Sequence, residues 1–283
     1  MRRLVCSADR FYASFRLSVQ ALGPVKQVAS AKAAVMPVRE TEAIILRSYP
    51  LKEADKIVSF FARVGGKTRG VAPNARRSVR RFGAGLELLS HVRLRYQERE
   101  AQELVRLESC ELLESFFDAQ SDYEVAVAFS HVAEVAEQLL PEREANDAFF
   151  RLILLVLEEI RRTGEIWRPL TYFGLWAVHL AGFLPPLDAC LRCGAALEPD
   201  EPAWFRSTSE GLRCRVCRTE GSSTLSPDSR TLARRMRAAS LANIPAEGWS
   251  KRRAADLRRF LCQEIERHLE RRLVTRPQLE GLG

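Results

Sequence analysis

The sequence lacks the features that mark membrane-spanning and fibrous proteins. It contains no apolar run of about 18 or more residues, no internal repeat of roughly 20–50 residues and no low-complexity tract. These absences exclude a membrane-spanning helix, collagen, a coiled coil and a solenoid. The most apolar stretch, residues 172–184, is short and runs into two prolines, so it predicts a buried helix.

The common signatures of catalysis are also missing. There is no phosphate-binding GxxxxGK[ST] loop, no dinucleotide-binding GxGxxG pattern and no HExxH. The four histidines are scattered, and His131 and His179 lie in apolar helical surroundings, where a hydrogen-bonded core role is expected. Glu158 and Glu159 are adjacent and therefore point to different faces of a helix. The sequence therefore predicts no catalytic residues and no enzyme. The alternative, a hydrolase with an unrecognised site, would need support from a turnover assay.

The charge of the chain is unevenly distributed. The 283 residues are 46% hydrophobic and 28% charged, as in a globular protein of about two domains. The formal net charge is +8. Residues 63–95 hold nine basic side chains and one acid, residues 228–283 carry a net charge of +6, and residues 121–182 carry −5. Basic segments this concentrated predict a polyanionic partner.

Cysteine usage indicates a reducing compartment. Seven cysteines occur, no cleavable secretory signal is evident, and four of the seven form two CxxC pairs. This pattern favours thiolate chemistry over disulfides, so we expect a cytosolic protein.

Residues 1–35 are rich in Arg, Ser and Ala and contain a single acid, Asp9. A transit peptide has this composition. The interpretation that we favour is an unstructured extension ahead of Met36, which would then be the natural start.

The segment from Glu40 to Cys110 predicts a small barrel. Ser48-Tyr49-Pro50 and Gly65-Gly66 are turn signals between apolar or alternating runs. Five short strands in about 75 residues favour a closed or partly closed barrel. The predicted strands are residues 41–47, 56–62, 67–72, 91–96 and 104–108.

After Cys110 the pattern becomes helical. Ser121-Asp122-Tyr123-Glu124 predicts a capping box at the start of the first helix. The second helix is bracketed by Asn146 and Gly164, and the third covers residues 167–182. Ser226-Pro227 opens a fourth helix and Ser250 a fifth. The expected fold class is α+β and multidomain: a barrel domain at residues 36–115, a helical domain at 116–275 with an insert at 188–225, and a tail at 276–283.

The insert contains the strongest motif of the chain, CxxC-x20-CxxC. Its spacing fits a tetrahedral Zn²⁺ site, because a two-residue gap lets both thiolates of a turn reach one ion. Four sulfur ligands leave no position for a bound water, so we expect one structural Zn²⁺ per chain. The alternative is that the four cysteines are buried or redox thiols. The predicted ligands are Cys190, Cys193, Cys214 and Cys217.

The basic strands and loops of the barrel predict contacts with single-stranded nucleic acid, in which arginines follow the phosphates and aromatic rings stack on the bases. Possible stacking residues are Tyr96, Phe61 and Phe82, although the two phenylalanines fit the core better. The predicted backbone contacts are Arg69, Arg76, Arg77, Arg80, Arg81 and Arg93.

A second basic set lies on the last two helices. It could extend the nucleic-acid track, rim a pocket for an acidic peptide tail with an apolar end, or simply keep the outer helix faces solvated. Its members are Arg234, Arg235, Arg237, Lys251, Arg252, Arg253, Arg258 and Arg259.

Several stretches, in order from Met36 to about residue 270, resemble the RecO family of bacterial DNA repair proteins. The amino-terminal resemblance lies in residues 39–47, residues 51–58, the Gly66-Lys67 turn, and residues 70–72 with the Arg-rich loop that follows. Leu180-Ala181-Gly182-Phe183 running into Cys190-Leu191-Arg192-Cys193-Gly194 resembles the second domain of the family. No single motif carries the resemblance, and residues 1–35 have no counterpart in it.

The resemblance implies an OB-fold domain, a helical domain with a zinc-finger-like insert, and ATP-independent work on the bacterial nucleoid in the RecF pathway of recombination. It implies binding of single- and double-stranded DNA, annealing of complementary strands and, with RecR, help in loading RecA onto DNA coated by single-stranded-DNA-binding protein (SSB), whose carboxyl-terminal tail would be a partner. The competing interpretation is a zinc-stabilised RNA-binding or transcription-associated module, because OB-type barrels also bind RNA.

Overall fold

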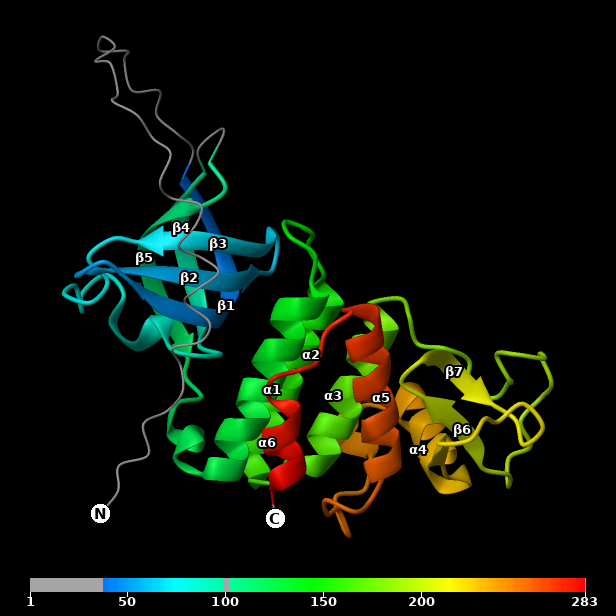
Figure 1. Cartoon of the computed structure of the whole chain (residues 1–283). Helices are drawn as coiled ribbons and strands as arrows, with labels where there is room; N and C mark the ends of the chain where they lie inside the picture. Colours follow the sequence, from blue (N-terminus) through cyan, green and yellow to red (C-terminus); the bar gives the residue numbers. More distant parts are fainter. Residues whose placement is uncertain (1–37, 99–101, 283) are drawn as a thin grey trace, which may run out of the picture. The chain divides into compact units, whose positions relative to one another are not determined.

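The computed structural model describes residues 38–98 and 102–282, and its amino-terminal part is a closed five-stranded barrel (Figure 1). The expectations for residues 1–35 lie outside the described residues. The strand order around the barrel is β1-β2-β3-β5-β4. The strands are β1 (Val38–Leu51), β2 (Asp55–Ala62), β3 (Gly66–Ala72), β4 (His91–Gln97) and β5 (Val105–Glu114).

Alternation along β4 separates the barrel interior from its surface. Val92, Leu94 and Tyr96 are buried, whereas Arg93 and Arg95 are exposed, as the period of two in the sequence predicts. The barrel closes where β3 runs parallel to β5, with Gly70 opposite Val105. A Cβ at Gly70 would lie 2.8 Å from Val105 Cγ2, so this close approach requires glycine.

The predicted turn at Ser48-Tyr49-Pro50 is wrong. Strand β1 continues through Pro50, which pairs with Lys56, and the chain turns at residues 52–54. Proline lacks a backbone N–H but is tolerated close to the end of a strand. Strand β5 also continues six residues beyond the predicted Glu108, to Glu114.

The carboxyl-terminal part is helical, with a small sheet of order β7-β6-β8 inserted between α3 and α4. Among the residues that the structure describes, no helix is long and apolar enough to cross a membrane. The helices are α1 (Tyr123–Leu139), α2 (Asp147–Thr163), α3 (Trp167–Leu180), α4 (Pro227–Ala238), α5 (Ala255–His268) and α6 (Arg276–Gly281), and the strands are β6 (Ala203–Arg206), β7 (Ser209–Arg213) and β8 (Ser223–Leu225). The short 3-10 helices are η3 (Gly83–Leu86), η4 (Asp118–Ser121) and η5 (Leu241–Asn243).

Helix caps confirm some of the predicted boundaries and correct others. Asn146 caps the start of α2, the left-handed Gly164 ends it, and Ser226 caps α4 through the N–H of Ser229. The cap of α1 is Asp122, because the Ser121 hydroxyl donates to Asp118 in η4 instead. Helix α5 begins at Ala255, not near Ser250, since residues 251–254 form bends and a turn.

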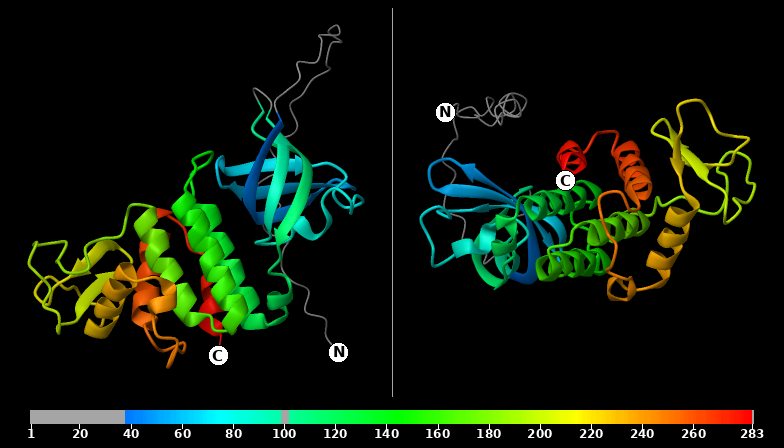
Figure 2. Two further views of the ribbon diagram at one scale, coloured as in Figure 1. Left: turned by 180° about the vertical axis from the view of Figure 1, so that it is seen from behind. Right: turned by 90° about the horizontal axis from the view of Figure 1, so that it is seen from below.

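One side of the barrel, at strand β2, packs on the helical part. Phe60 lies in the barrel core, whereas its neighbour Phe61 belongs to the helical core and packs on Phe149 and Phe150 of α2, with ring centroids 6.4 and 5.8 Å apart. Strand β2 is therefore buried on both faces, which explains its continuous apolar run. Figures 1 and 2 show α1, α2 and α3 side by side, with α5 and α6 along them.

A polar joint also links β2 and β3 to the end of α1. The buried Lys67 ammonium donates to the backbone oxygen of Glu137 at 2.7 Å, and the Ser59 hydroxyl donates to the Glu137 carboxylate at 2.7 Å. The backbone N–H of Arg143 donates to Lys67 O at 2.8 Å. The α1–α2 loop is therefore fixed directly against the start of β3.

Gly66→Ala is expected to destabilise the protein by about 2–4 kcal/mol. Gly66 has φ +72°, and an added Cβ would lie 2.3–2.5 Å from backbone atoms of Glu144. Gly164 has a similar φ of +69°, and an added Cβ there would meet no atom of the described residues within 4 Å. Gly164→Ala is therefore a matched control that should cost only about 1–2 kcal/mol. Urea unfolding measures the loss of unfolding free energy in both variants. Equal losses would show that the close contact between Gly66 and the Glu144 backbone does not matter for stability.

The segment after α5 is tied to α1 by a buried hydrogen-bond network. The Glu134 carboxylate accepts from the N–H of Val274 at 2.7 Å and from the N–H and hydroxyl of Thr275 at 2.8 and 2.6 Å. Because the Thr275 proton goes to Glu134, His131 Nδ1 must donate to Thr275 Oγ1, 2.9 Å away. His131 is thus a hydrogen-bonded core histidine, as the sequence predicts, whereas His179 is only half-buried beside Trp176.

Stability should fall on mild acidification because of His131. Burial lowers the pKa of His131 from 6.5 to about 4. Between pH 6.5 and 4 the histidine of the unfolded chain binds a proton, whereas the buried histidine of the folded chain stays neutral. The free energy of unfolding therefore falls by up to about 3 kcal/mol over this range and is unaffected by this group above it. Urea unfolding at pH 7, 6 and 5 should show the decline, and His131→Gln should flatten it. A decline of the same size in the variant would assign it to other groups.

Candidate metal centre and nucleic-acid interface

The four cysteines of the insert come together in one cluster. Their Sγ atoms all lie within 4.8 Å of one another, and Cys193 Sγ is 3.8 Å from Cys214 Sγ. Zn–S bonds of about 2.3 Å in a tetrahedron place the sulfurs about 3.8 Å apart. The residues therefore have the number, chemistry and spacing that one metal ion requires.

Tight turns shape each CxxC pair. The N–H of Gly194 donates to Cys190 O at 2.8 Å, with Gly194 at φ +73°, and the N–H of Cys217 donates to Cys214 O at 3.1 Å. Cys190 and Cys217 are buried, Cys214 is half-buried and Cys193 is exposed. The cluster therefore has one side in the core and one in solvent.

The thiols of the cluster do not ionise alike. Burial opposes ionisation of Cys190, but hydrogen bonds from backbone N–H groups, that of Cys214 foremost, outweigh it and lower its pKa to about 6. The hydrogen bond with Cys193, together with burial, raises the pKa of Cys217 to about 12. Four thiolates this close need a cation between them.

Arg230 of α4 holds the insert, and the sequence analysis missed it. Its side chain is fully buried and has four backbone oxygens as acceptors, those of Leu187, Leu197, Glu198 and Glu201, at 2.7–3.0 Å. Burial lowers its pKa. The helical period could have predicted its burial, because Arg230 lies on the same face of α4 as the buried Ala233 and Met236.

The loop after β3, residues 73–82, carries three exposed arginines. It is anchored on the β1–β2 turn, where the N–H of Asn74 donates to Asp55 Oδ1 at 2.8 Å and the N–H of Arg76 to Ala54 O at 3.0 Å. Arg77 is 71% exposed and meets an acid, Glu53, only at 4.0 Å. We call residues 73–82 the arginine-rich loop; Arg76, Arg77 and Arg80 are exposed on it.

The other predicted contacts have partners within the protein. Arg69 on β3 lies 3.8 Å from Glu137 and 3.7 Å from Glu142, across the joint with α1. Arg93 pairs with Glu111 at 2.9 Å. Arg81 donates to the backbone oxygen of Glu108 at 2.9 Å and lies over the Phe82 ring.

The interpretation of three aromatic residues as base-stacking platforms is wrong. Phe61 and Phe82 are buried, in line with the core role that the sequence favoured, and Tyr96 is only 2% exposed. Tyr96 packs inside the barrel against Phe60, with ring centroids 5.6 Å apart. The strand period places residue 96 on the inner face with Val92 and Leu94, so a base cannot reach its ring.

The second basic set divides into surface and anchoring residues. Arg258 is half-buried, donates to the Arg253 and Lys251 carbonyls and lies over the Trp167 ring, and Lys251 donates to Leu282 O. These two residues hold the loop before α5 and the end of the chain. The remaining arginines of the set are exposed, namely Arg234, Arg235, Arg237, Arg252, Arg253 and Arg259.

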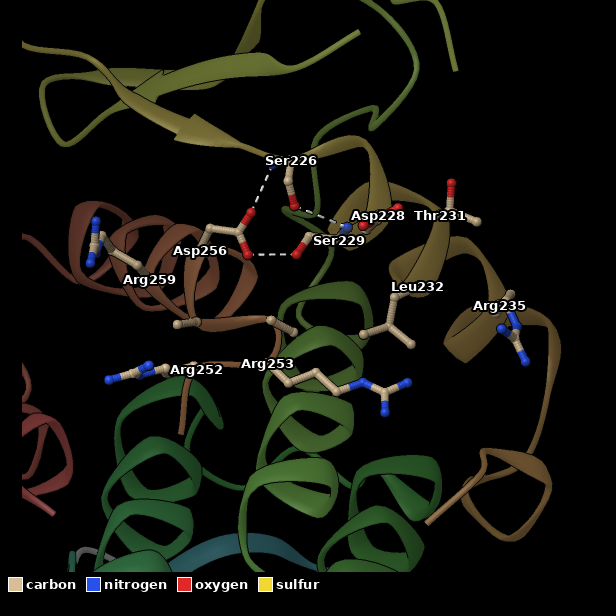
Figure 3. Close-up of a pocket in the computed structure, with 12 residues that line it drawn as sticks. Ser226, Asp228, Ser229, Thr231, Leu232, Arg235, Arg252, Arg253, Asp256 and Arg259 are labelled. Atoms are coloured by element: carbon tan, nitrogen blue, oxygen red, sulfur yellow. Dashed lines mark hydrogen bonds between the residues drawn. The ribbon is translucent and has the colours of Figure 1, made fainter. Parts of the chain in front are cut away.

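Four of these exposed arginines line a cavity of about 760 Å³ between α4 and the start of α5 (Figure 3). They are Arg235, Arg252, Arg253 and Arg259.

The fold and the cysteine centre together define an OB-fold-like barrel protein with a helical second domain and a candidate metal centre. Family models for "Recombination protein O N terminal" and "Recombination protein O C terminal" match residues 36–116 and 120–277. The chain therefore belongs to the RecO family of DNA repair proteins.

Curated relatives support the same assignment. The chain is 50% identical over 244 residues to the DNA repair protein RecO of Koribacter versatilis, covering 86% of this chain and 99% of the relative. It is 30% identical over 242 residues to RecO of Anaeromyxobacter sp. strain K, covering 85% and 95%. It is 31% identical over 259 residues to RecO of Symbiobacterium thermophilum, covering 87% and 98%.

Proposed function

We propose that this protein is a recombination mediator of the RecF pathway in the bacterial cytoplasm. It binds single- and double-stranded DNA, anneals complementary strands without nucleotide hydrolysis and, with RecR, helps to load RecA onto SSB-coated DNA. The observation that carries DNA binding is the exposed arginine-rich loop, in which three guanidinium groups lie within five residues. Like charges this close favour a polyanion as counter-ion.

DNA binding is assigned to the barrel domain, residues 36–115. Arg76, Arg77 and Arg80 are its principal phosphate contacts. Arg69, Arg81 and Arg93 flank them with smaller expected effects, because Arg69 and Arg93 pair with carboxylates and Arg81 is half-buried on Glu108 O. Arg76 also donates to a backbone oxygen, that of Glu53 at 3.2 Å, but its side chain stays exposed.

The four-cysteine centre is assigned one structural Zn²⁺. The ion would join the two CxxC turns through four thiolates and thereby fix the fold of the insert. The fit rests on the four sulfur ligands and their spacing, all within 4.8 Å of one another.

Annealing of SSB-coated DNA tests the proposed function. The full chain is added, without nucleotide, to complementary strands coated with SSB or with SSB that lacks its carboxyl-terminal tail. Rapid annealing that requires the tail supports a mediator that binds SSB. Slow annealing despite tight binding to bare strands contradicts it, and stronger binding to RNA than to DNA of the same sequence would favour the RNA-binding alternative.

Arg77→Ala should reduce the salt dependence of single-strand binding. One lost phosphate contact lowers the slope of log K against log salt by about 0.7–0.9. Arg162→Ala is the matched control, because Arg162 is comparably exposed at 62% but pairs with Glu159 on α2. Fluorescence anisotropy at several salt concentrations measures both slopes; an unchanged slope for Arg77→Ala would remove this residue from the interface.

A further inference from the structure

Arginine side chains line the cavity between α4 and α5 on both sides. Figure 3 shows the Arg252 and Arg259 guanidinium groups on one side, with the Arg253 side chain extending toward Arg235 on the other. Its volume of about 760 Å³ is within the range of roughly 300–1,000 Å³ that small-ligand sites occupy. The space is large enough for a nucleotide unit or a short peptide.

The four arginines of this cavity form no ion pair with the described part of the protein. Among residues 38–98 and 102–282, no carboxylate lies within 4.0 Å of the Arg235, Arg252, Arg253 or Arg259 guanidinium groups. Arg253 donates to the backbone oxygen of Glu247 and lies over the Trp249 ring, neither of which removes its charge. Like charges around one concave space favour a bound anion.

Two acids, Asp228 and Asp256, also line the cavity, so its four arginines leave a formal net charge of +2. Asp256 accepts from the Ser226 N–H at 2.7 Å, from the Ser229 hydroxyl at 2.5 Å and from the Leu257 N–H at 2.9 Å. Burial opposes ionisation of Asp256, but these hydrogen bonds outweigh it and lower its pKa. Asp256 therefore joins the starts of α4 and α5 and keeps its negative charge. Figure 3 shows Arg252 and Arg235 on opposite sides of this link.

The lining favours phosphate over an acidic peptide with an apolar end. Besides two alanines, Leu232 is the only apolar side chain among the described residues that line the cavity. An apolar peptide end would need a larger hydrophobic pocket. Hydroxyl groups of Ser226, Ser229 and Thr231 add polar surface, and guanidinium groups pair bidentately with phosphate.

We propose that this cavity binds the sugar-phosphate backbone of a second DNA strand. The inference rests on the proposed function, because annealing requires two strands on one protein. The first strand follows the arginine-rich loop of the barrel, and the second is held between α4 and α5. The barrel and the cavity are formed by different elements, so the two strands do not compete for the same arginines.

Energy transfer between two labelled, non-complementary strands tests this inference. The full chain is saturated with a donor-labelled single strand, and an acceptor-labelled strand of non-complementary sequence is then added. Transfer reports both strands on one protein without annealing. The double variant Arg252→Glu/Arg259→Glu changes two exposed side chains, so the fold is retained.

The double variant should bind the first strand as the original chain does and bind the second about tenfold or more weakly, with an equal fall in annealing rate. Arg272→Glu is the control, since Arg272 is exposed beyond the far end of α5, a helix of 14 residues or about 20 Å. This control should retain energy transfer and annealing. Unchanged second-strand binding in the double variant overturns the inference.

Two further outcomes separate the inference from the proposed function. An acidic peptide that binds the original chain but not the double variant, while both retain energy transfer, makes the cavity a peptide site and overturns the inference alone. If the original chain anneals SSB-coated strands but shows no energy transfer, the proposed function stands and the inference fails. If the original chain binds neither strand, both fail.

Discussion

Cys190→Ser is expected to reduce the metal content from about one Zn²⁺ per chain to near zero and to unfold the insert, residues 188–225. The strands of its sheet have only three to five residues, too few to be stable without support. Structural Zn²⁺ contributes about 10–16 kcal/mol of apparent binding free energy in zinc-finger peptides, so its loss exceeds what this small sheet can replace.

Elemental analysis, limited proteolysis and tryptophan fluorescence measure this effect. Cleavage should concentrate in residues 188–225, and the emission of Trp204 on β6 should shift to longer wavelength as it becomes solvated. Cys262→Ala is the control, because Cys262 is outside the four-cysteine cluster. A strong chelator should reproduce the effect of Cys190→Ser. Metal-free protein with a fully folded insert would refute the structural role of the ion.

Arg230→Met should destabilise the fold by about 3–5 kcal/mol, the second large effect. The substitution retains an apolar stem of similar length but removes the guanidinium donor from four backbone oxygens. The Leu187 and Leu197 oxygens are buried, whereas Glu198 O keeps the N–H of Glu201 at 3.2 Å. These oxygens belong to residues 187–201, so the loss should also weaken metal binding by the adjacent cysteines. Arg230→Lys should recover little, because one ammonium cannot reproduce the planar fork.

Arg234→Met is the control for Arg230→Met. Arg234 is one turn further along α4 and exposed, so its loss should change the free energy of unfolding by about 0.5 kcal/mol or less. Urea unfolding and zinc competition with a chromogenic chelator measure both variants. Equal unfolding free energies for the two would mean that solvent replaces the four hydrogen bonds.

Local sequence signals located most elements because their causes are local. Asn146 and Gly164 bracket α2 since a side-chain oxygen satisfies free N–H groups and glycine adopts positive φ. Local signals gave a wrong prediction at Pro50, where a turn was expected but β1 continues and pairs with Lys56 of β2. Ladder hydrogen bonds from a distant segment outweighed the local preference.

In the candidate sites too, local spacing was predictive and tertiary contacts were not predicted. Cysteine spacing alone predicted the four-cysteine cluster, because two residues between cysteines fix the geometry of each turn. Spacing could not distinguish exposed from paired arginines. Arg69 has partners more than 60 residues away on α1 and its following loop, whereas Arg77 pairs with the nearby Glu53 across 4.0 Å.

The sequence by itself determined the barrel followed by helices, the cysteine cluster and the basic segments, because hydrophobic period, caps and ligand spacing act over a few residues. Only the tertiary structure decided that Tyr96 is buried, that Arg230 holds the insert and that four arginines surround one cavity. Each of these features depends on contacts between segments that are distant in the sequence, because those contacts decide which side chains are buried and which charges are paired.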